Sequence, residues 1–384
     1  MLDAPLFNAL LQYDPAARFH MPAHNGAALD ALYASAPFDV TELSFSDNLA
    51  CPKGIILQAE SKTAAAVGVR HSLFFTGGAT SALFAAIYVL KEETDFVVTL
   101  GETHRSVTNA LEIFGIKSKE ATTLADIPAT ANAIIITSPD YYGNALNVRA
   151  VKERFPNALL LVDESHGAHF PYAKRLPESA AQIADLTVQS MHKTMPVYTG
   201  GALLHVQRER LYQKAVQARA KLGTSSPSYL VMASMDYARA LFEANGENYY
   251  NDIYQDVRSL VLPKGFERVE NDDFSRLVIR VPECTTGYAV AKAAEAEGIY
   301  FEMADERRLV AIITPFNRNK LPLLSRLQAP ETTPFKDHSH LLGKSFSQDL
   351  VLYPPGKIIL PKGTPLDEKT LEILNRDWER ILGL

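Results

Sequence analysis

Between about residues 72 and 206, short apolar runs alternate with segments of helical periodicity, and this alternation constrains the fold most strongly. Six runs have the length of strands: Leu73–Thr76, Phe96–Leu100, Ala133–Thr137, Leu159–Val162, Leu186–Gln189 and Ala202–Val206. Helices are expected between them, for example at Ser81–Lys91, Thr103–Phe114 and Val148–Phe155. Apolar strands separated by helices are typical of a mostly parallel sheet covered on both faces. The pattern therefore predicts an α/β fold that binds ligands at the carboxyl ends of its strands.

The remainder of the chain predicts a smaller α/β domain at the C-terminal end. Its expected elements are helices at Tyr229–Glu243 and 245–261, a strand at Ser275–Val281, a helix at Gly287–Glu297, a strand at Leu309–Thr314 and an amphipathic helix at Leu366–Leu382. We expect three parts, namely an N-terminal segment at 1–45, a large cofactor-binding domain at 46–245, and a linking helix with the small domain at 246–384.

Charge and cysteine content narrow the class of protein. The net charge of −6 gives no reason to expect a nucleic-acid or anionic-membrane partner. The chain has two cysteines, Cys51 and Cys284, without Cys-x-x-Cys spacing, and so few cysteines in 384 residues favour a reducing compartment without a disulfide framework. The first residues lack the basic and apolar regions of a signal peptide. The uncharged run Ser72–Leu90 contains a glycine turn and is interpreted as strand, turn and helix. We expect a cytoplasmic protein.

Lys193 and Asp163 each follow or end a predicted strand. Lys193 lies in Ser190–Thr194, directly after Leu186–Gln189, and Asp163 follows Leu159–Val162. This placement suits pyridoxal 5'-phosphate (PLP), because the lysine amine forms a Schiff base with its aldehyde and the aspartate keeps its ring nitrogen protonated. The alternatives are a solvated lysine and a helix-capping aspartate. The carboxylates and histidines of Asp163–His169 also permit a metal site, although we expect none.

Two further segments fit the same cofactor. Thr76–Ser81 joins a strand to a helix, and its glycines let backbone N–H groups approach an anion. With Ser190 and His192 nearby, we predict a phosphate cradle, whereas the alternative is a plain tight turn. The segment lacks the Gly-Lys-Ser/Thr ending of a Walker A loop. His104 begins a predicted helix after a strand and would stack on the cofactor ring, unless it is a capping or surface histidine.

Several segments together resemble the Orn/Lys/Arg decarboxylase family of fold-type-I PLP enzymes. In chain order they are Phe19–Gly26, Asp39–Leu43, Asp47–Leu49, Pro52–Ile56, His104–Ser106, Asp163–His169, Ser190–Thr194, Thr224–Tyr229 and Tyr353–Gly356. The resemblance implies an aspartate-aminotransferase-like large domain, PLP on Lys193, α-decarboxylation of an amino acid, and a homodimer with its active sites at the interface. It implies catalytic roles for Lys193, His104, Asp163 and His166. It also implies cofactor contacts from Lys193, Asp163, His104, Gly78, Ala79, Thr80, Ser190 and His192.

The chain departs from the family pattern where a substrate side chain would be recognised. The family's Pro-Gly-Glu is replaced by Pro361–Gly363, and Lys357 takes the place of an aliphatic residue. We therefore expect Tyr353, Lys357 and Lys362 to bind substrate, and the departures put the family's basic substrate in doubt. Transamination or carbon–carbon lysis remains an alternative, with the substrate carboxylate held by one of the arginines Arg276, Arg280, Arg307 and Arg308. A third alternative is a PLP-binding regulator without turnover.

Overall fold

The computed structural model describes residues 2–15, 18, 21–23, 25, 27, 31, 34–331, 338–353, 357–378 and 381–383. The contacts divide the chain into two compact units. The first comprises residues 1–101, 106–140 and 145–248, and the second comprises residues 102–105, 141–144 and 249–384. The three-part division expected from the sequence stays a prediction.

A seven-stranded sheet forms the centre of the first unit, in the order β1-β7-β6-β5-β4-β2-β3. Its strands are β1 (His71–Phe75), β2 (Phe96–Leu100), β3 (Lys117–Ala121), β4 (Ala133–Thr137), β5 (Leu159–Asp163), β6 (Leu186–Gln189) and β7 (Ala202–Val206). The pairs from β6 to β3 are parallel, whereas β7 runs antiparallel to both β6 and β1. The predicted α/β fold with a mostly parallel sheet is confirmed.

The edge strand β3 was not among the predicted strands. Four of its five residues are exposed, and three of them are charged. An edge strand with one neighbour needs no apolar run, so hydrophobic periodicity gives no signal for it. The six predicted strands are all present, and the largest difference is at β1, which begins two residues earlier than expected.

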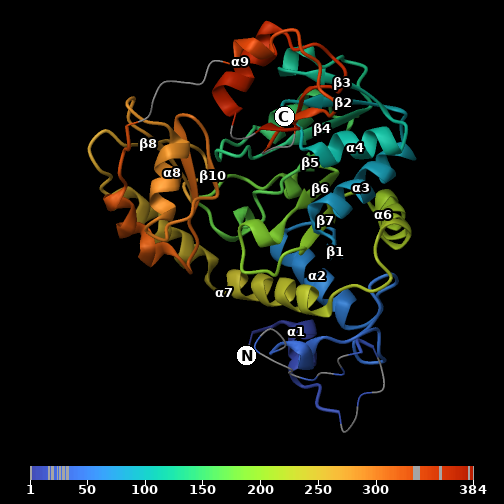
Figure 1. Ribbon diagram of the computed structural model, residues 1–384. Coiled ribbons are helices and arrows are strands. Elements are labelled where there is room, and N and C mark those ends of the chain that lie inside the picture. The colour runs from blue at the N-terminus through green and yellow to red at the C-terminus, as the bar shows by residue number, and fades with distance from the viewer. Residues whose placement is uncertain are drawn as a thin grey trace. The chain divides into compact units, whose positions relative to one another are not determined.

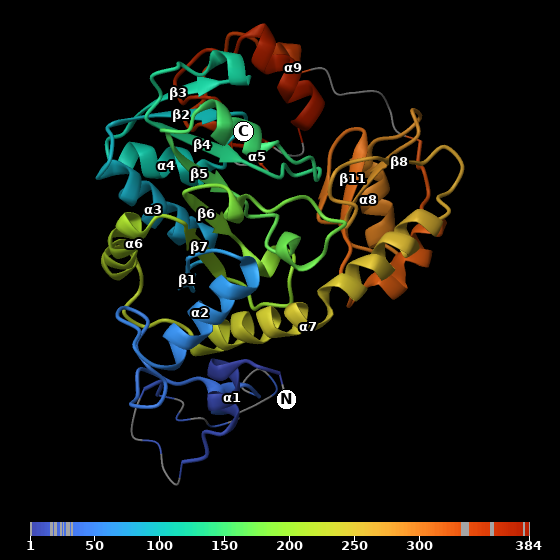
Figure 2. The ribbon, with the colours of Figure 1, turned by 180° about the vertical axis from the view of Figure 1, so that it is seen from behind.

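Helices cover both faces of this sheet, because alternate strand residues point to opposite sides. One apolar cluster joins the sheet to α3 (Gly78–Lys91), α4 (Arg105–Ile113) and α6 (Glu209–Leu222), which Figure 1 shows along one side. A cluster of the other strand residues includes Val148 and Val151 of α5 (Val148–Arg154). Figure 2 shows α5 beside β4 and β5 from behind. In addition, α2 (Ile55–Val67) packs on β1 and on α1 (Pro5–Leu11).

The two helices expected after residue 228 form one continuous helix, α7 (Tyr229–Ser259), so their separation was wrong. Gly246 lies inside this helix and allows close packing. A Cβ added there would lie 2.6 Å from the backbone oxygen of Tyr172. Asn245 does not interrupt the helix, because its side chain donates a hydrogen bond to the Leu241 carbonyl at 2.9 Å.

The second unit contains two antiparallel sheets. The four-stranded sheet has the order β10-β11-β9-β8, with β8 (Glu267–Val269), β9 (Arg276–Arg280), β10 (Met303–Ala304) and β11 (Arg308–Ile312). The three-stranded sheet has the order β13-β12-β14, with β12 (Leu350–Leu352), β13 (Lys357–Leu360) and β14 (Ile381–Leu382). The helices are α8 (Gly287–Glu295) and α9 (Glu368–Asp377). The predicted helix to Leu382 was therefore too long, because Ile381 and Leu382 pair with β12.

Short 3-10 helices connect many of these elements. They are η2 (Ala36–Phe38), η3 (Leu124–Asp126), η4 (Phe170–Tyr172), η5 (Ala180–Gln182), η6 (Met191–Lys193), η7 (Arg318–Arg326) and η8 (Ser339–Leu341). Both cysteines are free thiols at exposed positions, Cys51 in the first unit and Cys284 in the second. Within the described ranges, no helix is both long and apolar enough to span a bilayer.

Candidate active site

Lys193 lies close to His166 at the carboxyl ends of β6 and β5. Lys193 ends η6, which follows β6, and its Nζ lies 3.2 Å from His166 Nε2. His166 is buried, whereas Lys193 is half-buried. A neutral imidazole nitrogen accepts a hydrogen bond from an ammonium, so these two atoms can share one proton. Because β5 and β6 are parallel neighbours, the sheet brings the two residues to one edge, as ligand sites in such sheets require.

Asp163 is the last residue of β5 and is buried. Its Oδ1 accepts hydrogen bonds from the Ser165 backbone nitrogen at 3.1 Å and from Ser165 Oγ at 2.5 Å. Both side-chain hydrogen bonds found for Asp163 in the described part of the chain use Oδ1, so Oδ2 can accept another donor. A protonated ring nitrogen is such a donor, and Asp163 therefore fits the expected cofactor. The contribution of Ser165 was not predicted.

The phosphate cradle expected around Gly78 lies at the start of α3. Gly78 has φ +73°, and a Cβ there would meet nothing within 4 Å. Its N–H donates to the Gly200 carbonyl at 2.7 Å, so this N–H is not available to a phosphate. Ala79 and Thr80 lie in the first helical turn, where N–H groups have no partner inside the helix. These N–H groups, at the positive end of the helix dipole, suit a phosphate.

The residues after β6 lie beside this helix start. Ser190 is fully buried, and its Oγ lies 3.3 Å from His192 Nδ1. The same nitrogen lies 3.2 Å from the Gly201 carbonyl oxygen. Because Gly200 accepts from Gly78, the glycine turn connects the two predicted halves of the cradle. The structure thus brings Gly78, Ala79, Thr80, Ser190 and His192 to one region.

Other predicted site residues belong to the second unit. His104 precedes α4 and groups with that unit, so its stacking role stays a prediction. Tyr353 and Lys362 are exposed, and Lys357 begins β13, although its side chain lies outside the described part. Parts of the motif segments Phe19–Gly26 and Tyr353–Gly356 also lie outside the described residues. Substrate binding by these residues is untested.

The arginines considered for a substrate carboxylate have contacts of their own in the second unit. Arg276 is buried, and its Nη1 donates to the Tyr141 carbonyl at 3.2 Å. Arg308 Nε donates to Asp305 Oδ2 at 2.8 Å, and its guanidinium lies over the Tyr142 ring. Arg280 is exposed and paired with Glu267. Arg280 and Arg308 therefore already pair with carboxylates of the same unit, and a substrate role for any of the arginines stays a prediction.

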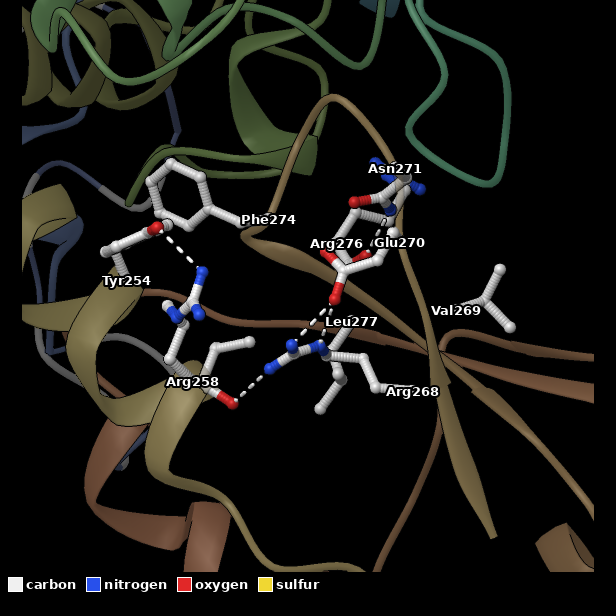
Figure 3. A pocket seen from close by; sticks show the side chains of 10 residues that line it. Tyr254, Arg258, Arg268, Val269, Glu270, Asn271, Phe274, Arg276 and Leu277 are labelled. Carbon is white, nitrogen blue, oxygen red and sulfur yellow. Dashed lines mark hydrogen bonds and ion pairs between the residues drawn. The ribbon is translucent and has the colours of Figure 1, made fainter.

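Arg276 also lines the small cavity shown in Figure 3, together with Tyr254, Val257, Arg258, Arg268, Val269, Glu270, Asn271, Phe274 and Leu277. Its volume is about 30 Å³. That is room for one or two water molecules and too little for an amino acid. Among the lining residues, Asn271 Nδ2 donates a hydrogen bond to the Arg276 carbonyl at 2.7 Å. This cavity is therefore no candidate for the active site.

The carboxylate next to Asp163, Glu164, was not predicted to have a role. It accepts hydrogen bonds from Ser179 Oγ at 2.7 Å, the Ala180 backbone nitrogen at 2.6 Å and Gln189 Nε2 at 2.7 Å. Burial raises its pKa from 4.5 to about 7, and the three donors oppose that rise. The carboxylate oxygens of Glu164 therefore both accept hydrogen bonds from the protein. Among the residues that the structure describes, no group of three or more His, Cys, Asp or Glu side chains could hold a metal ion.

Comparisons with known proteins show which families and folds this chain resembles. Residues 115–279 match the family model described as Orn/Lys/Arg decarboxylase, major domain. The uncharacterized protein YaaO of Bacillus subtilis is 29% identical, over 81% of this chain and 74% of that protein. An arginine decarboxylase of Bacillus anthracis is 23% identical, over 98% and 93% of the two chains. The fold is similar to that of lysine decarboxylase A from Pseudomonas aeruginosa, with a TM-score of 0.78 and 14% identity over 97% and 75% of the chains.

Proposed function

We propose that this chain is a member of the Orn/Lys/Arg decarboxylase family and a PLP-dependent enzyme that releases the α-carboxylate of an amino acid as carbon dioxide. One observation carries the proposal. Lys193 and Asp163 lie at the carboxyl ends of adjacent parallel strands, and Lys193 Nζ lies 3.2 Å from His166. A lysine, a buried carboxylate and an imidazole at that edge are the groups that this chemistry needs.

Each residue has a distinct part in the proposed reaction. Bound PLP would supply the electron sink for the pair released when the bond from Cα to the carboxylate breaks. Lys193 Nζ would hold the cofactor, and Asp163 Oδ2 would keep its ring nitrogen protonated. His104 would stack on the ring. The N–H groups of Ala79 and Thr80, with Ser190 and His192, would bind the phosphate.

The pair formed by Lys193 and His166 supports the proton transfers. Decarboxylation leaves an electron pair at Cα, which must receive a proton before the amine is released. A proton shared between Lys193 Nζ and His166 Nε2 is available at the same sheet edge. Burial of His166 limits exchange of this proton with bulk water.

A basic amino acid is the first substrate class to test, because curated relatives of this chain are named arginine decarboxylases. Three departures from the family sequence oppose this assignment. Lys357 and Lys362 add positive charges that would repel a cationic substrate side chain, and Gly363 replaces a glutamate. Acidic and neutral amino acids therefore belong in the same test.

The decisive experiment measures carbon dioxide, amine and keto acid from every common amino acid and from ornithine. We expect stoichiometric amine and carbon dioxide from one substrate class. Lys193→Ala should abolish turnover and PLP trapping by borohydride, whereas the matched surface variant Lys117→Ala on β3 should retain both. Keto acid as the main product would favour transamination, and PLP trapped at Lys193 without any turnover would favour the regulator.

We also propose that the enzyme is a cytoplasmic homodimer with active sites at its interface. The family resemblance supports the dimer, and free thiols at Cys51 and Cys284 agree with a reducing compartment. Sedimentation analysis of the holoenzyme should give about twice the monomer mass. A monomer with full turnover would contradict the dimer.

A further inference from the structure

Four buried polar side chains form a continuous line across four neighbouring strands of the large sheet. Ser72 of β1 lies with its Oγ 2.8 Å from His205 Nδ1 of β7. His205 Nε2 lies 2.9 Å from Gln189 Oε1 of β6, and Gln189 Nε2 donates to Glu164, directly after β5, at 2.7 Å. Each of the four is at most 3% exposed. We call these four residues the polar belt.

The hydrogen-bond directions in the polar belt follow from the orientation of the Gln189 amide. Gln189 directs its amide nitrogen to Glu164 Oε2 at 2.7 Å and its amide oxygen to His205 Nε2 at 2.9 Å. The His205 proton then lies on Nε2, and Nδ1 accepts from Ser72. Burial supports this arrangement, because it lowers the pKa of His205 from 6.5 to about 3 and keeps the imidazole neutral. Every hydrogen bond in the line therefore points toward Glu164.

Glu164 also joins segments on either side of the site. Its backbone nitrogen donates to the Val188 carbonyl at 2.8 Å, and its carboxylate accepts from Ser179 and Ala180 at the start of η5. Glu164 follows Asp163, and Gln189 precedes Ser190. The bond between the two side chains therefore ties the residue after the ring-binding aspartate to the residue before the phosphate-binding serine.

We propose that Glu164 is a positioning residue, which fixes Asp163 relative to Lys193 by holding the ends of β5 and β6 together. The inference rests on the proposed function, because it assumes that both residues contact PLP. Adjacent residues of an extended chain point to opposite faces, so Glu164 acts from behind the site and touches no substrate. A shift of about 1 Å in a reacting group can lower the rate about 100-fold. Fixing Asp163 relative to Lys193 therefore affects the rate.

The test uses the holoenzyme and three variants. Glu164→Gln keeps the shape of the side chain, but its amide nitrogen is a donor that would face the groups donating to Glu164, namely Ser179, Ala180 and Gln189. The exchange variant Glu164→Gln with Gln189→Glu restores one carboxylate and one amide to the pair. Asp185→Asn is the matched control, because Asp185 is a buried carboxylate at the opposite end of β6. It accepts from Lys152 Nζ at 2.7 Å and from the Leu160 nitrogen at 2.8 Å.

The readouts are the rate of PLP loss on dilution and the pH midpoint of the visible absorbance of bound PLP. We expect Glu164→Gln to lose PLP about tenfold faster, the change expected from the loss of one buried hydrogen bond. Its absorbance midpoint should also shift. The exchange variant should recover to within about threefold, and Asp185→Asn should match the wild type in both readouts. Wild-type values for Glu164→Gln would overturn the inference.

Two outcomes separate this inference from the proposed function. A wild-type protein that binds no PLP would contradict the function, whereas an active wild type with an unaffected Glu164→Gln would contradict only the inference. If Glu164→Gln does not fold, Ser179→Ala decides, because it removes one donor to Glu164 and keeps the charge. PLP loss at least about threefold faster supports positioning, and unchanged loss overturns it.

Discussion

Lys193 Nζ and His166 Nε2 lie 3.2 Å apart, although 27 positions separate the two residues in the sequence. The parallel pairing of β5 and β6 produces this contact, because both residues follow the carboxyl ends of these strands. If β5 and β6 ran in opposite directions, the residues that follow the two strands would lie at opposite edges of the sheet. The hydrogen bond is therefore a direct consequence of the sheet topology.

Replacing His166 should separate turnover from cofactor binding. We expect His166→Ala to retain PLP, because Lys193 and Asp163 remain, and to lose about 100-fold in kcat, the low end for a positioned proton-transfer group. Carbon dioxide release and PLP absorbance measure the two effects. His71→Ala is the control, because this histidine pairs with Glu209 at the surface. Wild-type kcat in His166→Ala would exclude a role in proton transfer.

Gly200→Ala should destabilise the protein more than Gly115→Ala. Both glycines have positive φ, +103° and +62°, which costs a residue with a side chain about 1–2 kcal/mol. At Gly200 the added Cβ would also lie 2.7 Å from the Thr76 oxygen, whereas at Gly115 it meets nothing within 4 Å. Urea unfolding should show the larger loss at Gly200, together with weaker PLP binding. Equal losses of unfolding free energy in the two variants would contradict this prediction, because they would mean that the turn at Gly200 shifts to accommodate the Cβ.

Glu164 should make stability depend on pH. Its pKa is 4.5 when exposed and about 7 in the folded protein, so the folded state binds more protons between these values. The unfolding free energy from this group therefore falls as pH rises through that window, by up to about 1.4 kcal/mol per unit, and is constant above it. Urea unfolding of the wild type minus Glu164→Gln measures the slope. A difference that is independent of pH would contradict this expectation.

The buried ion pair of α7 should matter far more than a surface pair. Arg239 Nη2 donates to Asp236 Oδ1 at 2.8 Å, and Asp236 Oδ2 accepts from the Leu6 nitrogen of α1 at 2.9 Å. Both side chains are at most 1% exposed. Asp236→Ala removes the buried one of the two carboxylates that pair with Arg239 and leaves only Glu243, which is about half exposed, so it should cost about 3 kcal/mol. Lys91→Ala, in an exposed pair with Asp95, should cost less than about 1 kcal/mol. Similar losses by calorimetry would contradict this ranking.

The sequence was sufficient for six of the seven strands of the large sheet, because buried parallel strands are continuously apolar, and for the positions of Lys193 and Asp163 at the ends of two of them. The roles of these two residues stay predictions. The sequence was not sufficient for the polar belt. Ser72 and His205 are 133 positions apart, and only the strand order β1-β7-β6-β5 makes their contact evident.

The two exposed thiols have a practical consequence. The chain contains two cysteines, and Cys51 and Cys284 belong to different units. A donor and an acceptor dye can therefore be attached through maleimide chemistry without any mutation. Energy transfer between the dyes would follow the distance between the units as PLP and then an amino acid are added. The unmutated protein therefore already contains the two thiols that a single-molecule energy-transfer measurement needs.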